Sequence, residues 1–404
     1  MLPYEFQLLL DNMTEPVNPS GHELFSNVSV IWDRSLRTCQ QWLSVGPVPR
    51  RSLIDESFER NITTLHFVTG IVEVFVNSLT LALILLKSTK AMTGYKNYIF
   101  VLQIAISLSG LQANILFTPF FYFPFPCVYG TGVLQTLFGV NPHPQFVTQV
   151  AMLFLMCVVI PCLSSCFIYR HQAILPRDSP YKLSPCIYRS LIGFIFVFFP
   201  SLSLLTIPAA MPKAVTIERL SLELPPDIVS RLPNLVCYSL TNQSWFTAFL
   251  VSLGSSGFFH ILFVVSITFH IYQVLQEMSA TMSVKAREYH RSSTRLLIIQ
   301  TSLPALFFVG PLCLTSALLV CAANNDPLSA FAGVLYSSYS LVHSIVTICM
   351  TPCYSETLTR LFRKKRIATI DSSSRTSSAA GRRRSFGSKH IVWFVQPEHA
   401  KYLK

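Results

Sequence analysis

The chain has 404 residues, of which 51% are hydrophobic and only 12% charged, and its mean hydropathy is +0.47. This balance excludes a water-soluble domain of that length and predicts a protein that crosses the membrane several times. The formal net charge of +12 does not indicate nucleic acid as a partner, because the basic residues are sorted between loops and not gathered on a soluble domain.

Residues 1–61 are polar and mixed, and we expect them to form an extracellular N-terminal segment. They contain three N-glycosylation sequons, which begin at Asn12, Asn27 and Asn61 and point to the lumenal side. The first ten residues include Glu5 and no basic residue ahead of their short leucine run. We therefore expect no cleavable signal peptide, and the first span must act as the anchor.

Seven apolar stretches follow, each long enough to cross a hydrocarbon core of roughly 30 Å as a helix. Prolines in the fourth and sixth stretches predict kinks, which membrane helices tolerate. The predicted fold is therefore an all-α bundle of seven transmembrane helices over residues 62–352. The predicted spans are residues 62–86, 98–121, 146–168, 191–209, 245–269, 296–320 and 331–352.

Lysine and arginine residues indicate the orientation of this bundle, because they stay preferentially on the cytoplasmic side. With the N-terminus outside, the cytoplasmic segments hold 23 of the 31 basic residues, and the outer segments hold 12 of the 19 acidic residues. We therefore expect the N-terminus outside and the C-terminus inside, with residues 353–404 as a cytoplasmic tail.

The third span ends in Tyr169-Arg170-His171-Gln172, followed by alanine and isoleucine. An apolar third helix with this ending resembles the nematode serpentine chemoreceptors, most closely class I, with class H as the near neighbour. These are rhodopsin-like seven-helix receptors, so the resemblance implies a G-protein-coupled receptor for a small environmental ligand. It implies a place in the plasma membrane, in the ciliary membrane of sensory neurons.

In that superfamily the third helix ends in an acidic-Arg-aromatic triplet whose arginine faces the heterotrimeric G protein. By this match Arg170, with Tyr169 and His171 beside it, is expected to couple to the G protein. Tyr169 stands where the superfamily has the acidic residue. A lock formed by a neighbouring carboxylate is therefore absent, and the resting state must use other partners.

The same resemblance predicts that the outer half of the third helix borders the ligand cavity. Gln149, Met152 and Met156 lie on one face there. Flexible methionines suit an apolar or mildly polar small molecule, although ordinary helix packing explains the pattern equally well.

The seventh span carries an aromatic stripe that is a second candidate for the cavity. Tyr336 and Tyr339 precede His343 on the same helix face. The stripe either lines the ligand pocket or surrounds a buried histidine that forms ordinary hydrogen bonds.

Glu73 is the only carboxylate in any predicted span, and it lies near the middle of the first. Burying an ionised carboxyl is costly, so such a residue usually faces the bundle or a wet cavity. It is either a ligand contact or a structural hydrogen-bonding group between helices, and the second role is the more common. Asn77, one turn later on the same face, is expected to be structural.

The outer cysteines lie in a compartment where disulfides form. The best pair is Cys127 with Cys237, which resembles the superfamily's bridge between the third helix and the second outer loop, although Cys127 precedes the third span. Cys39 with Cys321 is a further candidate pair. The second outer loop also carries a fourth sequon at Asn242 and is expected to cover the pocket.

The cytoplasmic tail divides into two parts. The basic, amphipathic residues 358–366 predict a helix that lies on membrane lipid. The serine- and arginine-rich stretch after residue 370 is of low complexity, and three arginines before Ser385 suit a kinase that prefers basic substrates.

The predicted spans lack an aspartate pair, closely spaced histidines and a lysine in the seventh span for retinal. We therefore expect no catalysis, metal, cofactor or light sensing. The alternatives are a seven-helix transporter or ligand-gated channel, and a receptor that acts without a G protein. A transporter would favour repeated halves and paired polar residues near the midplane, which the sequence lacks.

Overall fold

The computed structural model describes residues 56–88, 93–122, 127–138, 142–176, 178–210, 218, 235–238, 244–278, 283–320 and 326–360. It divides into two units, Met1–Ser355 and Glu356–Lys404, and the first contains the whole helix bundle. The predictions for Asn12, Asn27, Asn242, Ser385 and the pair Cys39 and Cys321 lie outside the described residues.

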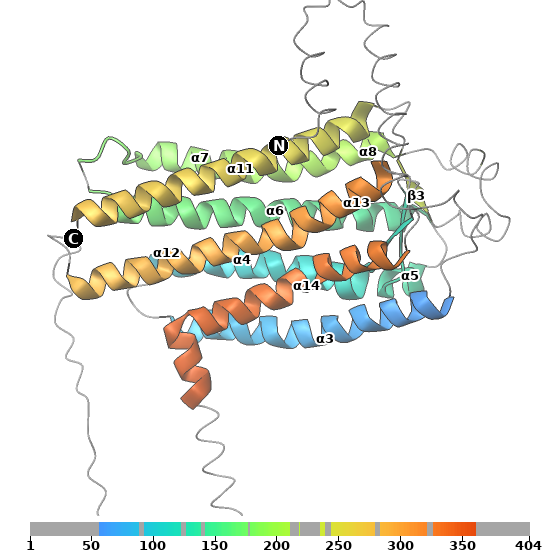
Figure 1. Ribbon diagram of the computed structural model, residues 1–404, viewed down its shortest axis with the longest axis horizontal. Coiled ribbons are helices and arrows are strands. Elements are labelled where there is room, and N and C mark those ends of the chain that lie inside the picture. The colour runs from blue at the N-terminus through green and yellow to red at the C-terminus, as the bar shows by residue number, and fades with distance from the viewer. Residues whose placement is uncertain are drawn as a thin grey trace, which may run out of the picture. The chain divides into compact units, whose positions relative to one another are not determined.

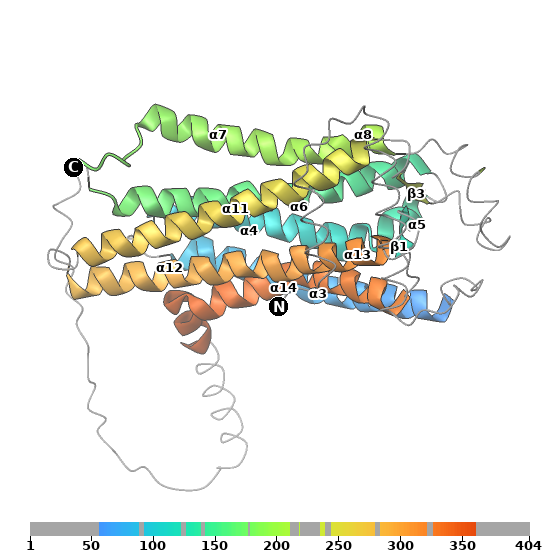
Figure 2. The same cartoon turned by 45° about the horizontal axis from the view of Figure 1, so that its top comes forward.

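The described part of the chain has seven helical segments that are long and apolar enough to cross a membrane, which confirms the predicted all-α seven-helix fold. They lie side by side in Figures 1 and 2. Four of them are continuous α-helices, because an apolar segment in lipid must satisfy its own backbone hydrogen bonds. These are α3 (Glu56–Lys87), α6 (Pro142–Ile174), α11 (Ser244–Glu277) and α14 (Asp326–Met350).

The other three segments change their helical pitch along the way. Pro200 and Pro208 flank a 3-10 turn, and Pro304 precedes a π-helical turn, as expected for residues without a backbone N–H. The second segment is α4 (Thr93–Leu111) continued by η2 (Gln112–Leu116), the fourth is α7 (Pro185–Ser201), η3 (Leu202–Leu205) and α8 (Thr206–Ala209), and the sixth is α12 (Val284–Pro304), η6 (Ala305–Val309) and α13 (Gly310–Val320).

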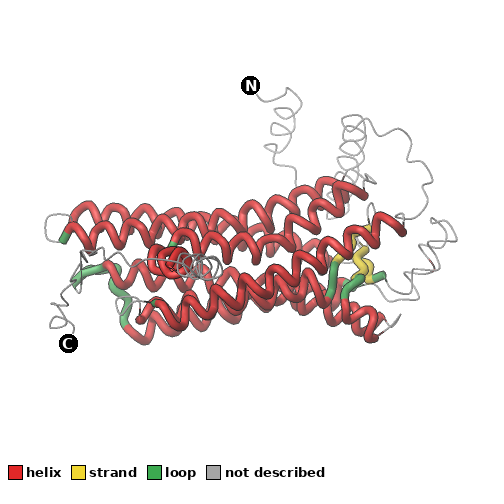
Figure 3. The backbone as a smooth tube through the Cα atoms, turned by 90° about the horizontal axis from the view of Figure 1, so that it is seen from below, coloured by secondary structure: helices red, strands yellow, loops and turns green. Residues whose placement is uncertain are grey.

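The predicted end of the second span at residue 121 is wrong. The helix ends at Leu116, and Pro119–Tyr122 is strand β1. Proline disfavours the helical conformation of the residue before it, and the aromatic run that follows suits a strand. β1 pairs antiparallel with β2 (Cys127–Gly130), which pairs with β3 (Val236–Cys237). This sheet and the short helix α5 (Val133–Phe138) lie at one end of the bundle, here called the sheet end (Figure 2), where Figure 3 shows the strands in yellow.

Two boundaries differ from the predicted domain limits. The first span begins at Glu56, before the predicted boundary at residue 62, so Asn61 lies exposed within α3. Residues 352–360 are helical, so a helix follows the seventh span and begins before the predicted start at residue 358, whereas residues 361–366 lie outside the described part of the chain. The roles predicted for the N-terminal segment and the tail stay predictions.

α6 is the central helix of the bundle. In its most apolar stretch 61% of the residues are buried, against 22% in α11 and 28% in α7. Figures 1 and 2 show α6 between α4 on one side and α7 and α11 on the other. α7 and α11 therefore turn most of their apolar stretches outward, as expected for helices that face lipid.

A buried polar network joins α3, α4 and α14. Asn77 donates from Nδ2 to Ser340 Oγ at 3.0 Å. Its Oδ1 accepts from Gln103 Nε2 at 3.2 Å and from the Ser344 hydroxyl, and Gln103 Nε2 also lies 2.7 Å from Ser344 Oγ. All four side chains are buried. Because unpaired polar groups are costly in hydrocarbon, these bonds hold the three helices in register.

Glu73 extends this network into the π-helical turn. Its carboxyl accepts from Asn77 Nδ2 at 3.3 Å and from Asn114 Nδ2 at 2.6 Å, and its side chain is only 1% exposed. Asn114 also donates to the Ser337 carbonyl at 3.0 Å, and its Oδ1 lies 3.0 Å from His66 Nδ1. Glu73 therefore bonds across helices at a closely packed point.

A glycine makes room for this carboxyl. A Cβ added at Gly110 would lie 1.5 Å from Glu73 Oε1 and 2.6 Å from Ser340 Cβ. We expect Gly110→Ala to destabilise the bundle by about 1–3 kcal/mol or more, because overpacking displaces the network. Surface labelling and thermal unfolding of the purified chain measure this. The control is Gly193→Ala, whose Cβ would meet nothing within 4 Å. Equal surface levels and unfolding temperatures for the two variants would contradict the predicted destabilisation by Gly110→Ala.

Candidate functional site

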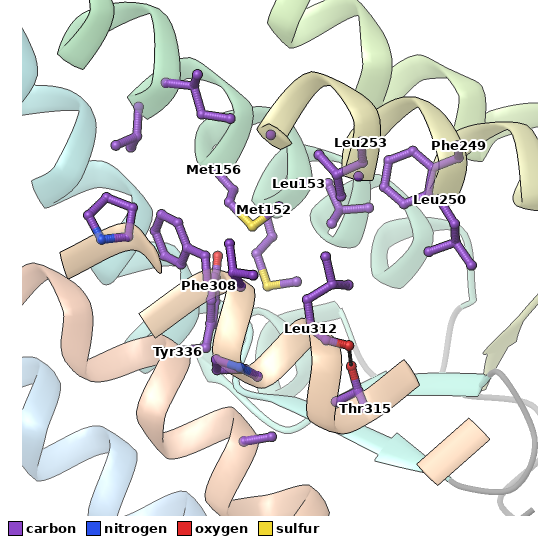
Figure 4. Close-up of a pocket in the computed structure, with 18 of the residues that line it drawn as sticks. Met152, Leu153, Met156, Phe249, Leu250, Leu253, Phe308, Leu312, Thr315 and Tyr336 are labelled. Atoms are coloured by element: carbon purple, nitrogen blue, oxygen red, sulfur yellow. Dashed lines mark hydrogen bonds between the residues drawn. The ribbon is translucent and has the colours of Figure 1, made fainter. Parts of the chain in front are cut away.

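A cavity of about 480 Å³ lies among α6, α11, the η6–α13 segment and the sheet. This volume is typical of small-molecule sites, which measure roughly 300–1,000 Å³. Figure 4 shows Met152, Leu153 and Met156 of α6 beside Phe249, Leu250 and Leu253 of α11, with Phe308 and Leu312 across the cavity from them. The cavity therefore occupies the half of the bundle nearer the sheet end.

The cavity wall is almost wholly apolar. Met152 and Met156 of α6 reach into it, facing Phe308 of η6 and Leu312 of α13 (Figure 4). Phe249, Leu250 and Leu253 line it from α11. Methionine side chains adapt to irregular shapes, so this wall suits an apolar ligand of variable outline.

A few polar groups interrupt the apolar wall. Gln149 lines the cavity with only 4% of its side chain exposed, and its Oε1 has no hydrogen-bond partner among the described residues. Thr301 also lines the cavity, and its hydroxyl also has no hydrogen-bond partner among the described residues. A buried acceptor without a partner is unfavourable, so a ligand that donates a hydrogen bond here would gain from both apolar burial and pairing.

The predicted ligand residues fall into two groups. Gln149, Met152, Met156 and Tyr336 line the cavity. Tyr339, His343 and Glu73 are buried but are not among its lining residues. The Tyr339 ring packs behind Phe308, with ring centroids 4.5 Å apart, and His343 follows at 5.8 Å from Tyr339.

His260 and Thr301 line the cavity but are not among the ligand residues that the sequence predicts. His260 Nδ1 lies 3.1 Å from Ser164 Oγ of α6, which orients the ring between the two helices. His260 is the only ionisable residue of the predicted span 245–269, and Thr301 lies between Gln300 and Ser302 in the predicted span 296–320. That signal exists in the sequence, but it does not say which face of the helix turns inward.

The sheet covers the cavity at the sheet end of the bundle. Phe121 of β1 and Val128 of β2 line it, with Tyr238 just after β3, whose ring stacks on Phe246 at 4.8 Å. A disulfide joins Cys127 and Cys237, the pair that the resemblance implied. The disulfide links β3, which precedes α11 in the chain, covalently to β2 within the sheet that covers the cavity.

Arg170 lies at the opposite end of α6, which we call the Arg170 end. Its side chain is only 4% exposed, and its guanidinium carbon lies 3.8 Å from the centroid of the Tyr95 ring of α4. Tyr169 packs beside it, with ring centroids 4.9 Å from Tyr98, whose hydroxyl lies 2.7 Å from that of Tyr188 in α7. Arg170 thus makes a cation–π contact where the superfamily has a neighbouring carboxylate.

His171 links α6 to α11 at the same end. Its Nε2 lies 2.7 Å from His270 Nδ1, and the Tyr181 ring meets His270 edge-on at 4.8 Å. One of the two facing nitrogens must carry the hydrogen, so at least one ring is held in a defined tautomer. Tyr169, Arg170 and His171 therefore contact α4 and α11 in the structure.

Comparison with known proteins agrees with this geometry. The family described as serpentine type 7TM GPCR chemoreceptor Sri matches residues 54–358. No curated protein matches the chain. Among solved structures, the crystal structure of squid rhodopsin is similar with a TM-score of 0.53 and 14% sequence identity, over 79% of this chain and 90% of that chain. At this identity the likeness concerns the fold alone.

The disulfide gives a direct test of how the cavity is covered. Cys127 and Cys237 enclose a separation of 110 residues, and loss of a native bridge over such a loop typically costs about 2–5 kcal/mol. We expect Cys127→Ser and Cys237→Ser to lower the unfolding temperature equally, and the double variant to be no worse than either. The control is Cys186→Ser, an exposed free thiol. Additive losses in the double variant would contradict the pairing.

Proposed function

The chain belongs to the Sri family of serpentine seven-helix chemoreceptors, and on this premise we propose that it binds a small apolar ligand in the cavity and signals through a G protein. The observation that carries the proposal is the cavity itself. It has the volume, the apolar wall and the few polar groups of a small-molecule site, and Gln149, Met152, Met156 and Tyr336 line it.

The proposed orientation places the sheet end outside the cell and the Arg170 end in the cytoplasm. The distribution of basic residues in the sequence supports it, because 23 of 31 fall in the segments predicted to be cytoplasmic. The disulfide at the sheet end supports it too, because disulfides persist in oxidising compartments. The protein then lies in the plasma membrane, with the ciliary membrane of sensory neurons as the expected site.

In the proposed mechanism, the ligand binds the active arrangement of helices more tightly than the resting one, which shifts the population. Arg170 is held on the Tyr95 ring in the resting arrangement and leaves it when the ends of the helices move apart. The G protein then contacts Arg170, Tyr169 and His171. Breaking the bond between His171 and His270 removes one polar link between α6 and α11 in the same step.

The central test is a ligand response in cells that express the chain. Cells are exposed to a panel of small volatile and water-soluble odorants, and calcium or cyclic nucleotide is measured with G-protein signalling blocked in parallel. We expect a response that the block removes and that Arg170→Ala abolishes at unchanged surface level.

The control for that test is Arg189→Ala, an exposed arginine at the start of α7, which should respond normally. Full signalling by Arg170→Ala would overturn the role of the arginine. A ligand-dependent current that survives the block would instead favour a channel.

The contact between Arg170 and Tyr95 yields a separate prediction for basal activity. Cation–π contacts contribute about 0.5–2 kcal/mol, so Tyr95→Leu should raise signalling without ligand by about two- to thirtyfold. Tyr95→Phe keeps the ring and should remain close to wild type. Basal signalling is measured at matched surface levels. Equal basal activity of the leucine and phenylalanine variants would show that the ring does not hold the resting state.

A further inference from the structure

The cavity reaches the outer surface of the bundle between α11 and η6. Phe258 and Ile261 of α11 line the cavity and are also 58% and 44% exposed, and Val309 of η6 lines it and is 42% exposed. A residue that both lines a cavity and faces outward marks a place where the cavity opens. We call this opening the seam, formed by Gly254, Gly257, Phe258 and Ile261 of α11 with Ala305 and Val309 of η6.

Two glycines keep the seam open. Gly254 and Gly257 are three residues apart and so share a face of α11. A Cβ at either position would meet nothing within 4 Å. In membrane bundles glycine usually lets two helices approach closely, as at Gly70 and Gly110, where a Cβ would meet side-chain atoms at 2.6 Å or less. At the seam the same residue type leaves space that none of the described helices fills.

The sheet end of the cavity is covered, in contrast, by the described residues of the sheet. Cys127, Val128 and Tyr238 line the cavity there and are all buried. The bridge to Cys237 fastens this cover. Among the residues that the structure describes, the exposed part of the cavity wall therefore faces sideways, toward the hydrocarbon core of the bilayer.

The chemistry of the seam selects the solute that can pass it. Its six residues are apolar or glycine, and they lie within α-helical and π-helical segments that cross the membrane. A polar solute would have to enter hydrocarbon first, at a cost of several kcal/mol for each unpaired polar group. An apolar solute is already concentrated in the lipid.

From this geometry we propose, resting on the receptor function proposed above, that the ligand is a lipophilic molecule that reaches the cavity from the bilayer through the seam. Gln149 and Thr301 line the cavity, and each has a side-chain oxygen without a hydrogen-bond partner among the described residues, so rotation of either side chain brings an acceptor to the ligand. The ligand class is therefore a neutral, mainly hydrocarbon compound with one hydroxyl or similar donor, bound with its apolar body against Met152 and Met156.

The test uses a photoreactive probe of that class, 1-decanol with a diazirine in its chain. Purified full-length chain in lipid vesicles is mixed with the probe and illuminated at increasing times, and mass spectrometry measures labelling of the α6 peptide that contains Met152 and Met156. We expect the rate of labelling to follow the mole fraction of probe in the lipid when the amount of lipid is varied at a constant total of probe.

Variants at the glycines separate the route from the site. Gly254→Phe and Gly257→Phe place a ring in the seam, and we expect each to slow labelling and release of the probe by about tenfold, with the final extent of labelling unchanged. The control is Gly193→Phe in α7, where the added side chain also starts in open space but lies outside the cavity wall. It should behave as the wild type.

The outcomes distinguish failure of the route from failure of the receptor proposal. Wild-type time courses in both seam variants would overturn the lateral route and leave the ligand cavity standing. A lower final extent at unchanged rates in both variants would also overturn it, because the rings would then fill the site and not the passage. No labelling of the α6 peptide in the wild type would overturn the apolar ligand site itself, and the route with it.

Discussion

The structure depends on one constraint, which is that no water is available inside the bilayer to pair with a buried polar group. Glu73 and Asn77 therefore bond to η2 and α14, and α4 contributes Gln103 to the same network. These bonds are directional, so they leave little freedom in how α3, α4 and α14 pack. Residue 110 must be glycine for the same reason, because the Glu73 carboxyl occupies the space that a side chain at this position would take.

The other half of the bundle is held together differently. Between α6, α11 and η6 the contacts are mainly apolar, and apolar packing is less directional than hydrogen bonding. This half contains the cavity, and its helix α11 is the least buried of the seven described spans. A firmly bonded half beside an adaptable half is a favourable arrangement for a receptor, because the adaptable half can change shape around a ligand while the other half holds its position.

α6 runs through both functional regions. It carries Met152 and Met156 at the cavity and Arg170 and His171 at the opposite end. With Tyr169 at the position of the superfamily's acidic residue, Arg170 lies against the Tyr95 ring, and a motion of α4 relative to α6 would change this contact. In the proposed mechanism this cation–π contact contributes to holding the resting arrangement.

The sequence by itself determined the seven spans, because a run of about 20 apolar residues in lipid has the helix as its main solution. It also determined that Gln149, Met152 and Met156 share a face, since helical spacing is a local property. Only the tertiary structure decided how deep each face lies. Tyr336 reaches the cavity, whereas Tyr339 and His343, on the same stripe, lie behind Phe308.

The strand at residues 119–122 was also decided by the tertiary structure. Its apolar aromatic run suits a helix in lipid as well as a strand, and pairing with β2 decides between the two. Asn77 and Ser340 are 263 residues apart, and their bond depends on how α3 and α14 pack. Local spacing is written in the sequence, whereas distances between helices follow from the packing of the whole bundle.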